Sequence, residues 1–314
     1  MHRRSEIAEG WRVSLHGGHS GEFCDHAEGT LREILEAAVA AGYHTFGVSE
    51  HVPRSAERFL YAEERDRGWD MAKITADFER YSEVLTPLAE EFADRLTVLR
   101  GFEAEVIPSD SYAEQVRGYR ERRLSPAGGP VFDYCVGSVH YVREHQIDGP
   151  PQNWALAAEA LGGPEMLAVR YYETVAEMTE TLHPEVVGHL DLIKRNAALA
   201  GFGDLPFDTP PIRRAALAAL EAVKAHDGIL DLNTAGWRKG LGEPYPAPWL
   251  VEQSQAMGIP FCFGDDSHSA RQVSSGLEEA RLFLLRNGVA QVTVLTREPC
   301  AAVGSPLIRQ TVAL

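Results

Sequence analysis

HTFGVS, residues 44–49, is a short apolar run, and an acid and a histidine, Glu50 and His51, follow it directly. A short run around Phe46 and Val48 that is followed by polar residues is typical of a buried parallel strand. Further runs of this kind occur at residues 11–15, 96–106, 132–139, 186–190, 228–233 and 259–264. The sequence therefore predicts seven or so buried strands.

Amphipathic segments lie between these runs, at residues 30–42, 70–93, 162–181, 210–226, 247–258 and 276–288. In the first, the apolar residues from Leu31 to Val39 fall on one stripe of a helix. Asp70 is expected to cap the second helix, and Pro87 is expected to kink or end it. Residues 290–295 predict one more strand near the C-terminus.

The repeated order of strand and helix, with seven or so strands, predicts a closed α/β barrel, and the alternative is an open doubly wound sheet. The 314 residues suit one barrel, which typically needs about 250. No break between two domains is visible, so we expect one domain over residues 1–314. Residues 143–165 interrupt the alternation and predict an insertion.

The composition excludes several classes of partner. The chain has 30 basic and 46 acidic residues, a formal net charge of −16, which argues against general binding to nucleic acid or anionic membranes. Residues 1–13 lack the apolar core of a secretory signal, and no stretch approaches the roughly 20 apolar residues of a membrane span. We therefore expect a cytoplasmic protein with reduced cysteines. Cys24 lies among histidines and could be a thiolate ligand, although packing is the simpler interpretation.

Histidines and carboxylates follow most of the predicted strands. In a barrel, the C-terminal ends of the strands converge on one mouth, so these side chains should meet there. A single one could be a hydrogen-bonded polar residue, but the bias recurs after strand upon strand. Imidazole and carboxylate together are what zinc, manganese or iron(II) prefer, and the number of such groups suggests two or three metals bridged by carboxylates. The residues are His16, His19, His26, Glu50, His51, Glu103, Glu105, His140, His189, Asp191, Asp265, Asp266 and His268.

An ordered set of motifs resembles the polymerase-and-histidinol-phosphatase (PHP) superfamily, and within it the histidinol-phosphate phosphatases. The motifs include HGGHS…CDHAEG (16–29), VSEHVP (48–53), GFEAEV (101–106), GSVHY (137–141), GHLDL (188–192), NTAG (233–236) and GDDSHS (264–269). The resemblance implies a distorted seven-stranded (β/α) barrel with a cluster of three metals in its mouth. The implied metal ligands are His16, His19, His26, His51, Glu103, His140, His189, Asp266 and His268, with Glu103 as the bridging carboxylate.

The first motif departs from the family pattern. Relatives usually carry His-x-His, whereas this chain has two glycines between His16 and His19. Side chains alternate along a strand, so this longer step points the two rings apart unless the backbone bulges. Gly17 and Gly18 are the residues that permit such a bulge. Glu50 stands where relatives often have Asp, and we expect it to orient His51 or a neighbouring ligand.

The expected reaction is hydrolysis of L-histidinol phosphate to L-histidinol and phosphate, a step of histidine biosynthesis. Hydroxide that bridges the metals is the expected nucleophile, with Glu103 in the catalytic centre. Asp266 or His268 could assist the leaving oxygen. The candidates for binding the phosphate are Lys194, Arg195, Arg238 and Lys239, with Arg54 as a weaker one. Those for the imidazole and ammonium groups of the substrate are Tyr141, Glu105, Asp191 and Trp237.

Two other functions fit the same residues. One is a metal-dependent phosphoesterase that acts on another small phosphomonoester or on a nucleotide. The other is a metal-binding module without catalysis on the same barrel, although such a module would not need nine ligand residues.

Overall fold

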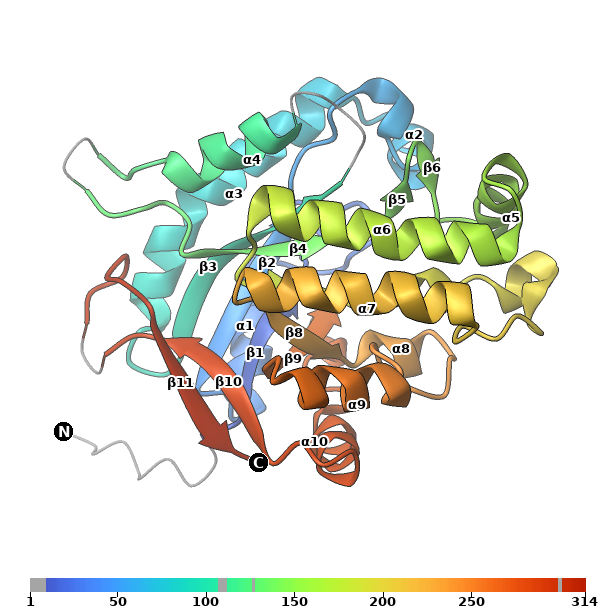
Figure 1. Ribbon diagram of the computed structural model, residues 1–314. Helices are drawn as coiled ribbons and strands as arrows, with labels where there is room; N and C mark the ends of the chain where they lie inside the picture. The colour runs from blue at the N-terminus through green and yellow to red at the C-terminus, as the bar shows by residue number, and fades with distance from the viewer. Residues whose placement is uncertain (1–9, 107–111, 126–127, 299–300) are drawn as a thin grey trace.

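Seven parallel strands close into a barrel, with β9 pairing back onto β1 (Figure 1). The computed structural model describes residues 10–106, 112–125, 128–298 and 301–314. The barrel strands, in their order around it, are β1 (Val13–Gly18), β2 (Thr45–His51), β3 (Thr97–Glu105), β4 (Tyr134–Ser138), β7 (Val186–Val187), β8 (Ile229–Asn233) and β9 (Phe261–Ser267). The predicted closed barrel is confirmed, and the open sheet is wrong.

Successive side chains of β3 point alternately out of the barrel, against the helices, and into its interior. Phe102 points outward, where its ring packs 4.9 Å from that of Phe132 and 6.5 Å from that of Phe78 on α3. Because neighbouring residues on a strand face opposite sides, Glu103 and Glu105 point into the barrel instead. Both carboxylates are almost completely buried. The interior near the strand ends is therefore polar, whereas the outer face of the barrel packs against helices.

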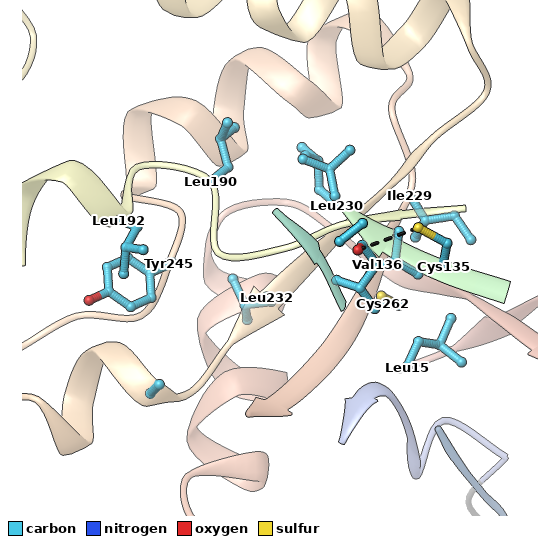
Figure 2. Close-up of a cluster of buried hydrophobic side chains, with 14 of the residues drawn as sticks. Leu15, Cys135, Val136, Leu190, Leu192, Ile229, Leu230, Leu232, Tyr245 and Cys262 are labelled. Atoms are coloured by element: carbon cyan, nitrogen blue, oxygen red, sulfur yellow. Dashed lines mark hydrogen bonds between the residues drawn. The ribbon is translucent and has the colours of Figure 1, made fainter. Parts of the chain in front are cut away.

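Figure 2 shows a cluster of buried apolar side chains contributed by β1, β4, β8 and the segment after β7. Leu15, Val136 and Leu230 are fully buried within it. Leu190 and Leu192, which follow the very short β7, are buried in the same cluster. Burying such side chains contributes about 1.5–3 kcal/mol each, so this packing anchors a segment that has little strand pairing of its own.

Helices surround the barrel, and the described ones are α1 (Leu31–Ala40), α2 (Ala62–Asp66), α3 (Met71–Phe92), α4 (Tyr112–Glu121), α5 (Pro151–Ala160), α6 (Pro164–Leu182), α7 (Pro210–Ala225), α8 (Ala235–Arg238), α9 (Pro248–Met257) and α10 (Leu277–Arg286). Asp70 caps α3 as predicted, accepting a hydrogen bond from the Lys73 N–H. Pro87 does not end α3, contrary to one of the two expectations. Pro87 lies on the exposed side of the helix, where water can satisfy the carbonyl that loses its partner.

Two small antiparallel sheets lie outside the barrel. The strand predicted at 290–295 is β10 (Gln291–Thr296), which pairs with β11 (Ile308–Ala313). The predicted insertion contains β6 (His145–Gln146), which pairs with β5 (Tyr141–Val142), and the whole of α5. Within the described ranges, no helix has the length and apolar character needed to cross a bilayer. Cys24, Cys135 and Cys262 are free and buried, and Cys300 lies outside the described residues.

Candidate metal centre

The carboxylate of Glu103 faces five imidazole rings at the C-terminal end of the barrel. These rings come from β1 and the residue after it, from β2, and from the segments that follow β4 and β7. Oε1 lies 3.2 Å from His189 Nε2, 3.6 Å from His16 Nε2 and 3.7 Å from His140 Nε2, and Oε2 lies 3.1 Å from His51 Nδ1 and 3.3 Å from His19 Nε2. Four of the rings and the carboxylate are buried, and the His51 side chain is 12% exposed.

Most of these ring nitrogens make no hydrogen bond. Among the described residues, buried nitrogens without a partner occur on His16 (Nε2), His19 (both), His51 (Nδ1), His140 (Nδ1) and His189 (Nδ1). A buried polar group without a partner costs about 1–3 kcal/mol, so a set of them at one place indicates atoms that bind a ligand.

The same nitrogens and carboxylates fall into compact groups whose donor atoms lie within 4.8 Å of one another: His16–His19–Glu103, His51–Glu103–His140, His19–Asp266–His268 and Cys24–His26–His268 among them. Neutral imidazole and carboxylate are suitable donors for divalent transition metals. The residues present therefore fit a metal cluster.

Neighbouring groups of opposite charge shift the pKa values of Glu103 and His19. Burial by itself raises the pKa of Glu103, but the nearby His51, His16 and His140 hold that pKa well below its usual range. Burial likewise lowers the pKa of His19, but the carboxylates of Glu103 and Glu50 raise that pKa to about 9. Glu103 is therefore an anion at neutral pH and can accept a metal.

The glycine pair between His16 and His19 brings the two rings together. The pairing of β1 with β9 shifts register at His16 and again at Gly18, as expected of a bulge. The rings of His16 and His19 lie 6.2 Å apart and both face Glu103. A side chain at Gly17 would meet the Gly47 carbonyl oxygen at 2.4 Å, and one at Gly18 would meet the Ser267 oxygen at 2.2 Å. The predicted bulge is confirmed.

Asp231 holds two of the histidines from within β8. Its Oδ2 lies 2.9 Å from His16 Nδ1, and its Oδ1 accepts a hydrogen bond from the backbone N–H of His189 at 2.5 Å. A proton on Nδ1 of His16 leaves Nε2 free to bind a metal, which is the usual role of such a carboxylate. Sequence reasoning missed Asp231 because it considered residues that follow strands. The signal was an acid in the middle of a buried apolar run.

Replacing Asp231 by Asn is expected to weaken metal binding or activity about 10- to 100-fold, because the amide no longer fixes the tautomer of His16. Metal affinity by competition with a chromophoric chelator measures the effect directly. Asp227→Asn is the matched control, since that exposed carboxylate pairs with Arg309 at the surface. Equal affinities of the two variants would contradict the role assigned to Asp231.

Glu105 forms a second buried layer behind two of the rings. Its Oε1 lies 3.3 Å from His51 Nδ1, and its Oε2 lies 3.6 Å from His140 Nδ1. Arg54 Nη1 donates a hydrogen bond to Oε1 at 3.1 Å, so Arg54 holds the Glu105 carboxylate in place. Burial raises the pKa of Glu105, but Arg54 and His140 hold it well below its usual range. Arg54, a weak phosphate candidate in the sequence, is thus committed to an internal ion pair.

Glu50 does not reach His51 as one expectation had it. Its Oε1 accepts hydrogen bonds from the N–H and the hydroxyl of Ser20, at 2.7 and 2.9 Å. Its Oε2 lies 3.5 Å from His19 Nδ1, so it orients a neighbouring ligand, the alternative expectation. Asp25 plays a similar part for His26, whose Nδ1 is 2.9 Å away.

Asp266 and His268 close the centre on the side of β9. Asp266 Oδ1 lies 3.7 Å from both His19 Nε2 and His268 Nδ1. Asp266 has a φ of 46°, and His189 has a φ of 27°. Such backbone is costly for residues other than glycine and is typical of functional sites. Arg238 fixes this turn by donating to the carbonyl oxygens of Asp265 and Asp266.

The four predicted phosphate ligands separate into two pairs. Arg195 and Lys239 line the cavity above Glu103. Lys194 instead pairs with Asp191 at 2.8 Å and with Glu243 at 2.6 Å. Arg238 donates its hydrogen bonds to backbone carbonyl oxygens at the end of β9. The cavity is also lined by residues that sequence reasoning did not assign, namely Tyr61, Asp148, Leu192, Ala235 and Tyr245.

The candidates for the cationic part of the substrate have other partners. The Tyr141 hydroxyl donates to the Phe59 carbonyl oxygen, and Trp237 packs against Phe283.

Two of the predicted metal ligands, His26 and His268, lie at the cavity wall, with ring centroids 4.8 Å apart. Burial raises the pKa of the Cys24 thiol well above its usual value, which favours packing over metal ligation for this residue.

Comparison with known proteins agrees with this geometry. The sequence profile of the PHP domain matches residues 15–235. The chain belongs to the PHP domain family. A probable histidinol-phosphatase of Schizosaccharomyces pombe is 30% identical over 91% of this chain and 90% of its own length. One from Deinococcus radiodurans is 34% identical over 82% and 87%, respectively.

Two solved structures have the same fold as this PHP domain. A putative histidinol phosphatase from Listeria monocytogenes has a TM-score of 0.73 at 24% identity, covering 85% of this chain and 99% of its own. The histidinol phosphate phosphatase of Lactococcus lactis, complexed with zinc, L-histidinol and phosphate, has a TM-score of 0.66 at 17% identity, covering 95% and 99%.

Lowering the pH from 9 to 6.5 is expected to shrink the stability that metal adds to the PHP domain. Although burial lowers them, nearby carboxylates raise the pKa values of His19 and His140 from 6.5 to about 9 in the metal-free fold. Protonation therefore stabilises the metal-free fold below pH 6.5, and this stabilisation is lost as the pH rises through 9. Metals need neutral imidazoles, so protons compete with them. Melting temperatures of both forms at both pH values test this; a gap that stays constant or widens on acidification would contradict it.

Proposed function

We propose that this PHP domain hydrolyses L-histidinol phosphate to L-histidinol and phosphate. The observation that carries the proposal is a buried carboxylate, Glu103, surrounded by five imidazoles at the floor of a cavity with Arg195 and Lys239 on its wall. Acidic and imidazole donors at the floor suit metal ions, and cations on the wall suit a phosphate dianion. Relatives over most of the chain carry the name histidinol-phosphatase.

Two or three divalent ions, of zinc, iron or manganese, are the proposed cofactors. His16, His19, His51, His140, His189 and Glu103 would hold them at the floor, with Asp266, His268 and His26 nearer the mouth. When bound, such ions activate water as a nucleophile and neutralise the charge of a phosphoryl group. Glu103 is shared by the floor groups, so its charge would balance more than one ion.

The chain's own residues position the phosphate. Arg195 and Lys239, which line the cavity, are proposed to bind its oxygens. Burial, and then the charge of Arg195, lowers the pKa of Lys239, so an arriving anion would favour its ammonium form. The oxygen that leaves with the alcohol needs a proton. Asp266 and His268 line the cavity, and a residue that holds a metal is deprotonated, so only the one of the two that does not hold a metal is a candidate to deliver it.

Phosphate release from a panel of phosphomonoesters tests the proposal, with metal-loaded protein before and after treatment with a chelator. Histidinol phosphate is expected to be among the best substrates, and chelation is expected to abolish turnover. A preference for nucleotides or another small ester would show that the proposed substrate is wrong and that the proposed phosphoesterase activity is right. Bound metal without turnover of any ester would favour a metal-binding module.

A further inference from the structure

Asp148 carries a buried carboxylate oxygen that no described residue satisfies. It lies between β6 and α5, in the segment predicted as an insertion, and lines the cavity above Glu103. Its Oδ2 lies 3.6 Å from Arg195 Nη1, beyond hydrogen-bond distance. Its Oδ1 is buried without a partner among the described residues. A carboxylate accepts several hydrogen bonds, so an unsatisfied buried oxygen at a cavity wall points to a donor on a ligand.

The other acidic residues that line the cavity already have a role in the proposed metal centre. Glu103 and Asp266 face imidazoles and belong to the proposed metal centre. Asp148 lies outside that centre and lines the cavity together with Tyr61 and Tyr245. Aromatic faces and a carboxylate together favour a cation and disfavour an anion. The cavity thus holds, beside the cations proposed to bind phosphate, one acid outside the metal centre, Asp148, that suits a cationic nitrogen.

We propose that Asp148 is a specificity-determining residue that accepts a hydrogen bond from a cationic nitrogen of the substrate. The inference rests on the proposed phosphatase activity and deepens it by assigning the residue that selects amino-bearing phosphomonoesters over uncharged ones. A site with a buried polar group discriminates strongly, because an analogue that lacks the matching donor leaves that group unpaired. The competing view is that Asp148 only orients Arg195, in which case every phosphate ester would depend on it equally.

Asp148→Asn is the direct test, because it removes the charge and keeps the size of the side chain. The readout is the ratio of kcat/KM for L-histidinol phosphate to kcat/KM for phenyl phosphate, whose leaving group is uncharged. We expect the ratio to fall at least about tenfold, mainly through KM for the cationic ester. Glu144→Gln is the matched control, since Glu144 pairs with Arg58 at the surface of the same segment, and its ratio should equal that of the wild type. An equal fall for both esters would overturn the proposal.

The wild-type protein gives a second test that needs no variant. Phosphoethanolamine and propyl phosphate are small esters of similar size that differ in the cationic nitrogen. We expect about tenfold or greater preference for phosphoethanolamine, and no preference would overturn the role of Asp148. Lack of turnover of histidinol phosphate, with this preference retained, would instead overturn the proposed substrate and leave the selection by Asp148 standing.

Discussion

Glu103→Gln is expected to lower kcat/KM by at least about a thousandfold and to reduce the metal content of the purified protein. The amide keeps the shape of the carboxylate but loses the charge that five imidazoles face. Metal ions at the floor would then lack the anion that they share, and their mutual repulsion would rise. Elemental analysis of the protein and steady-state kinetics measure the two effects.

The variant also separates folding from metal binding. Because the surrounding imidazoles hold the pKa of Glu103 well below its usual range, the carboxylate stabilises the metal-free fold, and the amide should lower its melting temperature. Added metal should raise the melting temperature of the wild type far more than that of Glu103→Gln. Glu91→Gln is the control, because Glu91 pairs with Arg32 at the exposed surface. Full metal content in Glu103→Gln would remove the central role of this carboxylate.

Local sequence patterns predicted the strands because each one is short, apolar and buried, and the repeated order of strand and helix predicted the barrel. The search for ionisable residues at the ends of predicted strands also found His16, His51 and Glu103, because parallel strands in a closed barrel must end at one mouth. The family resemblance added the expectation that Glu103 is the shared carboxylate. The structure places this residue at the centre of the imidazoles.

Long-range contacts were not predictable in the same way. Asp231 lies inside an apolar run, and only the barrel brings it within hydrogen-bond distance of His16, 215 residues away. Lys194 and Arg238 follow strands as Arg195 and Lys239 do, yet their partners at Glu243 and at the end of β9 draw them out of the cavity. Which cation faces the substrate depends on such partners, and single-sequence patterns do not contain them.

Gly18→Ala is expected to destabilise the fold by about 2–3 kcal/mol and to impair metal binding as well. The new Cβ would lie 2.2 Å from the Ser267 carbonyl oxygen, and this oxygen accepts a hydrogen bond from the His19 N–H. Relief of the collision must separate β1 from β9 at the point where their register shifts, and His19 would move with the backbone.

Gly68→Ala is the control that distinguishes the effect of the steric contact with Ser267 from the effect of a positive φ alone. Gly68 has a φ of 70°, and a Cβ added there would have no neighbouring atom within 4 Å, whereas Gly18 has a φ of 149° and the contact with Ser267. Gly68→Ala should therefore cost only about 1 kcal/mol and leave metal affinity unchanged, because strain in the left-handed region is its sole penalty. Chemical denaturation and metal titration of both variants give the comparison. Equal losses of stability, with metal affinity intact in Gly18→Ala, would show that the bulge between His16 and His19 does not depend on the glycine at its end.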